Sequence, residues 1–215
     1  DVLEGSIPTY LQDDDNQWCG FSQRARILFY DKNDVAEPPM TYQELADPKY
    51  AGKVCIRSSS NVYTQNITAA LIAHLGEDAI GDWAKGVVSN FARDPQGGDT
   101  DQLRGLVSGE CDVVMSNTYY FARSIRKDVD GLPADARENI GWVFPNQNSI
   151  GALMNISGGG VAANAPNKDN AIKFLEYLAS EQAQEYFSAG NDEYPGVPGV
   201  GLAPSVATLG IFRPD

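Results

Sequence analysis

The sequence is poor in the residues that define several common protein classes. It contains one histidine, three cysteines and no uninterrupted run of about 18 apolar residues. Three cysteines are too few for a disulfide-stapled scaffold, although they allow one bridge and one free thiol. Basic residues are outnumbered by acidic ones, which gives a net charge of -13 and a pI near 4.4. Without a long apolar run, we expect no membrane span. We also expect no nucleic-acid partner and no anionic-membrane partner, because negatively charged surfaces would repel this acidic chain.

What the sequence contains is an alternation of strand-like and helix-like segments. A length of 215 residues with 42% apolar content suits one large domain or two small lobes. The alternation favours an open α/β sheet. We expect strands at 24–30, 53–58, 111–117, 140–145 and 149–157, a short helical turn from Thr41 to Glu44, helices within 59–76, 77–91, 100–110, 118–128 and 167–190, and an irregular Gly/Pro segment at 191–204.

One construction occurs twice in the sequence. "KVCIRSSSNVY" and "GECDVVMSNTYY" each run from a Cys-containing strand through a small polar turn into a helix that begins with tyrosine. The tyrosine follows the cysteine at the same spacing in both. Ligands of open α/β sheets bind at the carboxyl ends of strands, where the following helices begin. We therefore expect Tyr63, Tyr119 and Tyr120 to lie at such an edge.

Three phenols at helix N-termini favour a particular chemistry. A phenol has a pKa of about 10 and ionises near neutral pH only when something stabilises its charge. A hard, trivalent cation does so strongly, and hard oxygen ligands select it over zinc or copper. Ferric iron is the biological metal that fits best, with a small anion attracted to the helix N-termini. The alternative is structural, because ten tyrosines are present and a helical pair is often one buried and one exposed residue.

At these residues the chain resembles the ferric-ion-binding proteins, which are periplasmic substrate-binding components of bacterial iron ABC transporters. The resemblance rests on "FSQRARILFY", "GKVCIRSSSNVYTQN", "GECDVVMSNTYYFAR", "NISGGGVAANAPNKDNAIKFLEYLASEQAQEYF" and "NDEYP". It implies Fe(III) as the cargo, iron uptake as the function, an inner-membrane ABC permease as the partner, a periplasmic location, a monomeric state and no catalysis.

The resemblance also implies a set of site residues. Tyr119 and Tyr120 match the family's paired iron-ligating tyrosines, and Tyr63 matches a third tyrosine used by one branch. A synergistic anion such as carbonate or phosphate would lie near the turn and the strand end that precede these tyrosines. Guanidinium offers a fork of donors suited to such an oxyanion. The anion-binding residues implied are Ser59, Ser60, Asn61, Asn117 and either Arg24 or Arg26.

The fold implied is the two-lobed type II fold of periplasmic binding proteins. The first lobe would comprise 1–23 and 146–190, and the second lobe 24–145 and 191–215. The second lobe would be nearly complete and would carry the tyrosines. The first lobe would lack its N-terminal part, about the first quarter of a family member, including a His-Tyr or similar pair that adds iron ligands.

Further expectations concern the cysteines, two rival functions and the single histidine. Cys55 and Cys111 lie on strands expected to be neighbours, so they can form a disulfide in an oxidising periplasm; the alternative is two buried thiols. One rival function is the same fold binding an oxyanion or a polyamine without metal. A second is an enzyme with a serine of 58–60 as nucleophile and His74 as base, which the missing G-x-S-x-G pattern disfavours. We expect His74 at the surface or core rim.

Overall fold

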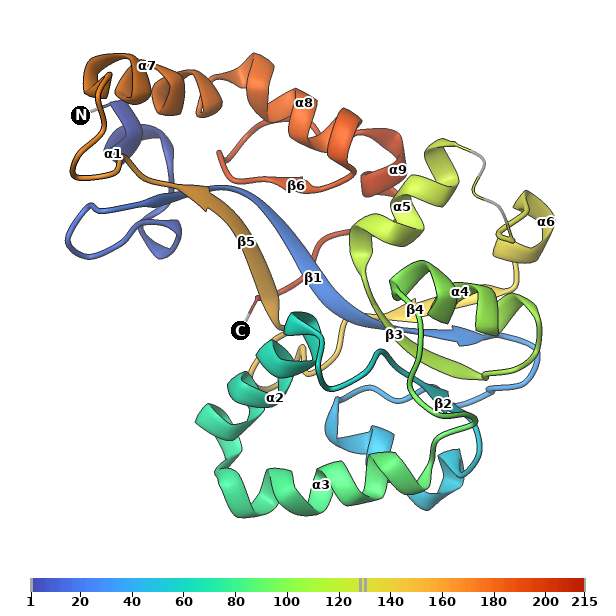
Figure 1. Cartoon of the computed structure of the whole chain (residues 1–215). Helices are drawn as coiled ribbons and strands as arrows, with labels where there is room; N and C mark the ends of the chain where they lie inside the picture. Colours follow the sequence, from blue (N-terminus) through green and yellow to red (C-terminus); the bar gives the residue numbers. More distant parts are fainter. Residues whose placement is uncertain (1, 128, 130, 215) are drawn as a thin grey trace. The chain divides into compact units, whose positions relative to one another are not determined.

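The computed structural model describes residues 2–127, 129 and 131–214 and divides the chain into two compact units. Unit 1 comprises Asp1–Arg24 and Met154–Gly210, and unit 2 comprises Ala25–Leu153 and Ile211–Asp215. The first passage between the units occurs inside one long strand, β1 (Cys19–Asp31), whose two halves serve different units (Figure 1).

A mixed sheet forms the centre of unit 2, with its strands in the order β2-β3-β1-β4. Strand β1 is antiparallel to both neighbours, whereas β2 is parallel to β3. The β1–β3 register places Arg26 opposite Asn117, so two of the predicted site residues meet where β3 ends. The bounds are Val54–Cys55 for β2, Val113–Asn117 for β3 and Ile140–Val143 for β4.

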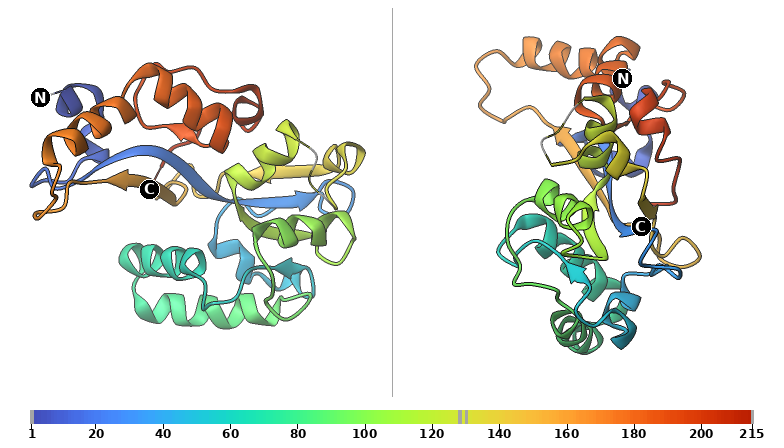
Figure 2. Two further views of the ribbon diagram at one scale, coloured as in Figure 1. Left: turned by 45° about the horizontal axis from the view of Figure 1, so that its top comes forward. Right: turned by 90° about the vertical axis from the view of Figure 1, so that its right-hand side faces the viewer.

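Both faces of this sheet are covered because its central strand is apolar on both sides. Neighbouring residues of a strand point to opposite faces. Leu28 joins a core cluster with residues of α2 and α3, which lie side by side in the left view of Figure 2. Phe29 points to the other face, where its ring centroid lies 5.1 Å from the ring centroid of Phe121 in α5. The helices are α2 Val62–Leu75, α3 Glu77–Ser89, α4 Asp99–Val107, α5 Thr118–Arg126 and α6 Ala134–Arg137, with 3-10 turns at Gln43–Ala46 and Pro48–Tyr50.

Unit 1 is built on the first half of β1, which pairs with β5 and, antiparallel, with β6. Leu11 and Phe21 lie in its core, against partly buried side chains of α7 and α8. The amide oxygen of Gln184 accepts hydrogen bonds from the backbone N–H groups of Gly196 and Val197, which fixes the Gly/Pro segment to α8. The bounds are α1 Val2–Ser6, a 3-10 turn Thr9–Leu11, β5 Met154–Gly159, α7 Lys168–Leu178, α8 Glu181–Asn191, β6 Tyr194–Pro195 and α9 Pro204–Ala207.

The predicted α/β class and the main predicted elements are confirmed. The helix expected to end at Gly76 is α2, and the 167–190 segment forms two helices because Ser180 caps the second one. The predicted strand 149–157 begins later, at Met154. The helix predicted over 118–128 ends at Arg126, and Asp128 itself lies outside the described residues. The short helices α1, α6 and α9 had no periodicity from which to predict them.

The compact units differ from the predicted lobes in two segments and at one boundary residue, Arg24, which belongs to unit 1. Residues 191–210 belong to unit 1, whereas the prediction grouped them with 24–145. The reason is that β6 pairs with the first half of β1 and that the Ser188 hydroxyl accepts a hydrogen bond from the Ala203 N–H. Residues 146–153 belong to unit 2, where the Tyr42 hydroxyl accepts a hydrogen bond from the Leu153 N–H.

A disulfide joins Cys55 and Cys111, as predicted, with their Cα atoms 5.8 Å apart. The bridge ties β2 to the segment that enters β3, and these two strands are parallel neighbours. Helix α4 passes close to the bridge, since a Cβ atom on Gly105 would lie 2.6 Å from the Cys111 sulfur. The two strands that lead to the tyrosine-bearing helices are therefore covalently linked.

We predict that replacing both bridged cysteines by alanine lowers the free energy of unfolding by about 2–4 kcal/mol, because the bridge closes a loop with a sequence separation of 56 residues. Urea titration of the wild type and the variant measures this change. Reductant should destabilise the wild type and leave the variant unchanged. Equal midpoints for the two proteins in the absence of reductant would contradict the prediction.

Candidate functional site

Two of the predicted tyrosines meet in unit 2, although they come from different helices. Tyr63 is the second residue of α2 and Tyr119 is the second residue of α5. Their hydroxyl oxygens lie 3.3 Å apart. Both helices begin where a strand of the same sheet ends, so the sheet edge brings the two phenols together. This convergence agrees with the arrangement expected from the repeated strand-turn-helix construction.

The third predicted tyrosine stacks on the second. The rings of Tyr119 and Tyr120 have centroids 4.1 Å apart and an interplanar angle of 30°. Arg123, on the same helix, holds its guanidinium carbon 5.3 Å from the Tyr119 ring centroid and 6.0 Å from that of Tyr120. Burial raises the pKa of the Tyr119 phenol, and hydrogen bonds to Tyr120 and Tyr63 raise it further. Without a cation, the Tyr119 phenol is therefore protonated at neutral pH.

A buried ion pair lies next to the ring of Tyr63. Arg26 and Asp99 are both fully excluded from solvent, and Arg26 Nη1 donates to Asp99 Oδ2 at 2.6 Å. Arg57 Nη1 lies 3.7 Å from Asp99 Oδ1. The guanidinium carbons of Arg26 and Arg57 lie 5.6 and 5.5 Å from the Tyr63 ring centroid. Two cationic groups therefore contact one phenol ring, and one carboxylate joins them.

The strand end before Tyr119 is part of the same network. The Asn117 N–H donates to Asp99 Oδ2 at 3.2 Å, and Asn117 Oδ1 accepts from Arg26 Nη1 at 3.4 Å. Among the described side chains, several buried donors here have no hydrogen-bond partner: Arg26 Nε and Nη2, Arg57 Nε and Asn117 Nδ2. Unpaired buried donors are uncommon in folded proteins. Asp99 Oδ1 likewise accepts no hydrogen bond and contacts Arg57 only as an ion pair, so hydrogen-bonding capacity in this network is left unused.

The other predicted anion-binding residues lie at the turn before α2 or in unit 1. Ser59 and Ser60 are exposed, and the Asn61 side chain caps α2 by accepting from the Tyr63 N–H at 3.0 Å. Arg24 belongs to unit 1, where its Nη1 donates to the Ser157 hydroxyl at 2.6 Å. Of the two predicted arginines, Arg26 is the one that contacts another predicted site residue. The anion-binding roles remain predictions.

His74 lies exposed in the last turn of α2, in agreement with the expectation from sequence. Among the described residues, no group of three or more His, Cys, Asp or Glu side chains is arranged to hold a metal ion. The clustered phenols offer hard oxygen ligands in unit 2. In the described part of the chain, no helix is both long and apolar enough to cross a bilayer.

Three charged residues of this site were not predicted. Arg57 lies near the end of the predicted strand 53–58, and Asp99 follows two glycines just before the predicted helix 100–110 and is the first residue of α4. The local sequence does not predict burial at either position, because burial here results from contacts between distant segments. Arg123 was within reach of sequence reasoning, since it is four residues beyond Tyr119 on a predicted helix and such residues share a face.

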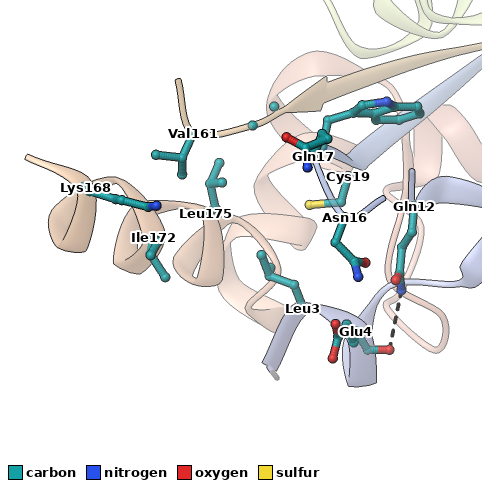
Figure 3. Close-up of a pocket in the computed structure, with 13 residues that line it drawn as sticks. Leu3, Glu4, Gln12, Asn16, Gln17, Cys19, Val161, Lys168, Ile172 and Leu175 are labelled. Atoms are coloured by element: carbon teal, nitrogen blue, oxygen red, sulfur yellow. Dashed lines mark hydrogen bonds between the residues drawn. The ribbon is translucent and has the colours of Figure 1, made fainter. Parts of the chain in front are cut away.

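Unit 1 contains a separate pocket of about 330 Å³ (Figure 3). Leu3 and Glu4 line it from α1, and Ile172 and Leu175 from α7. Its lining mixes aliphatic side chains with Glu4, Lys168 and three amide side chains, includes the buried thiol of Cys19, and contains none of the predicted site residues. One carboxylate beside a lysine and a thiol is a poorer ligand set for a trivalent cation than three phenols. The tyrosine cluster of unit 2 is therefore the better candidate site.

Known proteins resemble this chain along its whole length. It is 48% identical over 216 aligned residues to iron uptake protein A1 of Synechocystis sp., an alignment that covers 100% of this chain and 60% of that protein. It is 30% identical to the major ferric iron-binding protein of Neisseria meningitidis, over 83% of this chain and 52% of that protein. The chain thus spans about half to two thirds of these relatives, and the uncovered share exceeds the predicted quarter.

Solved structures share the fold. A Trichodesmium protein (IdiA, FutA) in complex with iron and citrate superposes with a TM-score of 0.93 at 48% identity, covering 100% of this chain and 68% of that one. This likeness confirms the predicted type II periplasmic-binding fold. The family model for bacterial extracellular solute-binding proteins matches residues 4–208. The chain therefore belongs to the bacterial extracellular solute-binding protein family.

Proposed function

We propose that this chain carries the iron site of a bacterial substrate-binding protein for iron uptake, with Tyr63, Tyr119 and Tyr120 as phenolate ligands of Fe(III). The observation that carries the proposal is the 3.3 Å approach of the Tyr63 and Tyr119 hydroxyl oxygens from two separate helices. Tyr120, stacked on Tyr119, adds a third phenol. The proposal is supported by relatives named for iron uptake and ferric iron binding.

The charges around the phenols suit a trivalent cation. Three phenolates would neutralise the three positive charges of Fe(III), so the bound ion adds no net charge to the site. Arg26 and Arg57 beside Tyr63, and Arg123 beside the pair, would stabilise the negative charge that the phenols acquire when they ionise. Phenolate oxygen is a hard ligand and favours Fe(III) over softer ions.

Three phenolates leave coordination positions for other ligands. An exogenous anion such as carbonate or phosphate, or water, would fill them, and the anion would lie close to the exposed Ser59 and Ser60 turn and the N-terminus of α2. In the related Trichodesmium structure the iron is accompanied by citrate.

The wider role that we propose is the one typical of the family. The protein would act in the periplasm as a monomer, carry Fe(III) to an inner-membrane ABC permease and catalyse no reaction. Release would follow from protonation of the phenolates, reduction of the iron or loss of the anion. The alternative is a carrier of the same fold that binds an oxyanion or a polyamine without metal. In that case the tyrosine hydroxyls would bind no metal, and the visible absorption spectrum distinguishes the two functions.

We predict a visible charge-transfer band when the metal-free protein receives chelated Fe(III) and bicarbonate, because Fe(III)-phenolate bonds absorb visible light. Tyr119→Phe with Tyr120→Phe should abolish the band. It should also reduce iron affinity by at least about 100-fold, since even outer-shell partners of metal ligands contribute 10–100-fold. Spectra and chelator competition provide the two measurements.

Tyr186→Phe is the matched control for this experiment. Its side chain is exposed and belongs to α8 in unit 1, so the band and the affinity should not change. A band that survives in the double variant, or that is equally lost in the control, would contradict the ligand assignment.

We predict that iron affinity falls as the pH falls. Burial raises the pKa of the Tyr119 phenol, so the metal-free site holds a proton that Fe(III) must displace. Lowering the pH strengthens that competition, and between about one and three protons should leave for each iron bound. Chelator competition between pH 5.5 and 8, together with proton release measured by an indicator dye, tests this. Affinity independent of pH would exclude protonated phenols as the ligands.

A further inference from the structure

Asp99 connects the two arginines beside Tyr63 to the strand that precedes Tyr119. Its Oδ2 atom accepts from Arg26 Nη1 at 2.6 Å and from the Asn117 N–H at 3.2 Å, while its Oδ1 atom lies 3.7 Å from Arg57 Nη1. The carboxylate is fully excluded from solvent. One side chain of α4 therefore contacts β1, the turn after β2 and the end of β3.

The position of this carboxylate is the one that a small oxyanion would take. Guanidinium groups bind carboxylates and other oxyanions through the same donors. Arg26 and Arg57 approach Asp99 from two directions, and a backbone N–H supplies a further donor. The chain itself thus supplies the anion that two buried or half-buried arginines require.

The unsatisfied donors give the network the capacity to hydrogen-bond a larger anion. Within the described residues, Arg26 Nε and Nη2, Arg57 Nε and Asn117 Nδ2 are buried and make no hydrogen bond. A carboxylate has two oxygens, whereas carbonate has three and phosphate four. Without the Asp99 side chain, such an anion would find both a vacated position and enough donors.

We propose that Asp99 is a positioning residue that acts as a built-in counter-anion for Arg26 and Arg57. It holds both guanidinium groups against the Tyr63 ring, and thereby holds Tyr63 beside Tyr119 without an exogenous anion. Removing the carboxylate converts its position into a binding site for a small oxyanion, and iron capture then depends on that anion. This inference rests on the proposed iron function.

The experiment compares wild type, Asp99→Ala, Asp99→Asn and Asp82→Ala. Asp82 provides the matched control, because it also pairs with a cation in unit 2, Lys85 at 2.9 Å, but on an exposed helix face. Iron affinity is measured by chelator competition and by the visible band, in bicarbonate-free buffer and with added bicarbonate or formate. Melting of the iron-free proteins is measured with and without formate.

Wild type and Asp82→Ala should bind iron with equal affinity in each buffer, and added bicarbonate or formate should raise that affinity by less than about tenfold. Asp99→Ala should lose about tenfold or more in affinity without anion, as expected for an outer-shell partner, and should recover with bicarbonate or formate. Formate should also raise the melting temperature of iron-free Asp99→Ala and leave that of the wild type unchanged. Asp99→Asn should lose affinity without recovery, because its amide fills the vacated position.

Several results would overturn the inference. They are full affinity of Asp99→Ala or Asp99→Asn without anion, a folded Asp99→Ala that no anion restores, or a wild type that gains tenfold from bicarbonate. If Asp99→Ala does not fold, Asp99→Asn decides. A wild type that shows no band under any condition contradicts the iron function instead, and the effect of formate on iron-free Asp99→Ala still tests the role of Asp99.

Discussion

The burial of Arg26 is the constraint on which the candidate site depends. A guanidinium group that is excluded from solvent requires an anionic partner. Here that partner is Asp99, at the start of α4. Removing one partner of a buried pair typically costs about 3–5 kcal/mol, whereas a surface pair is worth little. The pair therefore fixes α4 against β1, and with it the strand end at Asn117. The position of Tyr63 follows, because its ring contacts the same guanidinium.

Two independent links hold the tyrosine-bearing helices together. The Cys55–Cys111 bridge joins the segments that lead into α2 and α5. The Arg26–Asp99–Arg57 network, through the Asn117 N–H, joins the turn after β2 to the end of β3. Ligands held in place before the metal arrives lose little conformational entropy on binding, which favours tight capture. Both links lie within unit 2, so this unit carries the chemistry of the proposed site.

Local patterns were sufficient to predict the tyrosines and most of the elements. The repeated order of cysteine, polar turn and tyrosine located Tyr63 and Tyr119, and their hydroxyl groups do meet. Asp99 was not predictable from local pattern, because a carboxylate in a glycine-rich turn is normally solvated and only the distant Arg26 makes it a buried partner. The 191–210 segment was assigned to the other lobe for the same reason, since its partners on α8 and β1 are tertiary contacts.

The central claim is that phenolate oxygens bind the iron, and resonance Raman spectroscopy tests it most directly. With excitation inside the visible band of the iron-loaded protein, only vibrations of groups bonded to the absorbing metal are enhanced. The account predicts enhanced tyrosinate ring vibrations that weaken when Tyr119 and Tyr120 are replaced by phenylalanine. Bound iron with no enhanced tyrosinate vibration would contradict it.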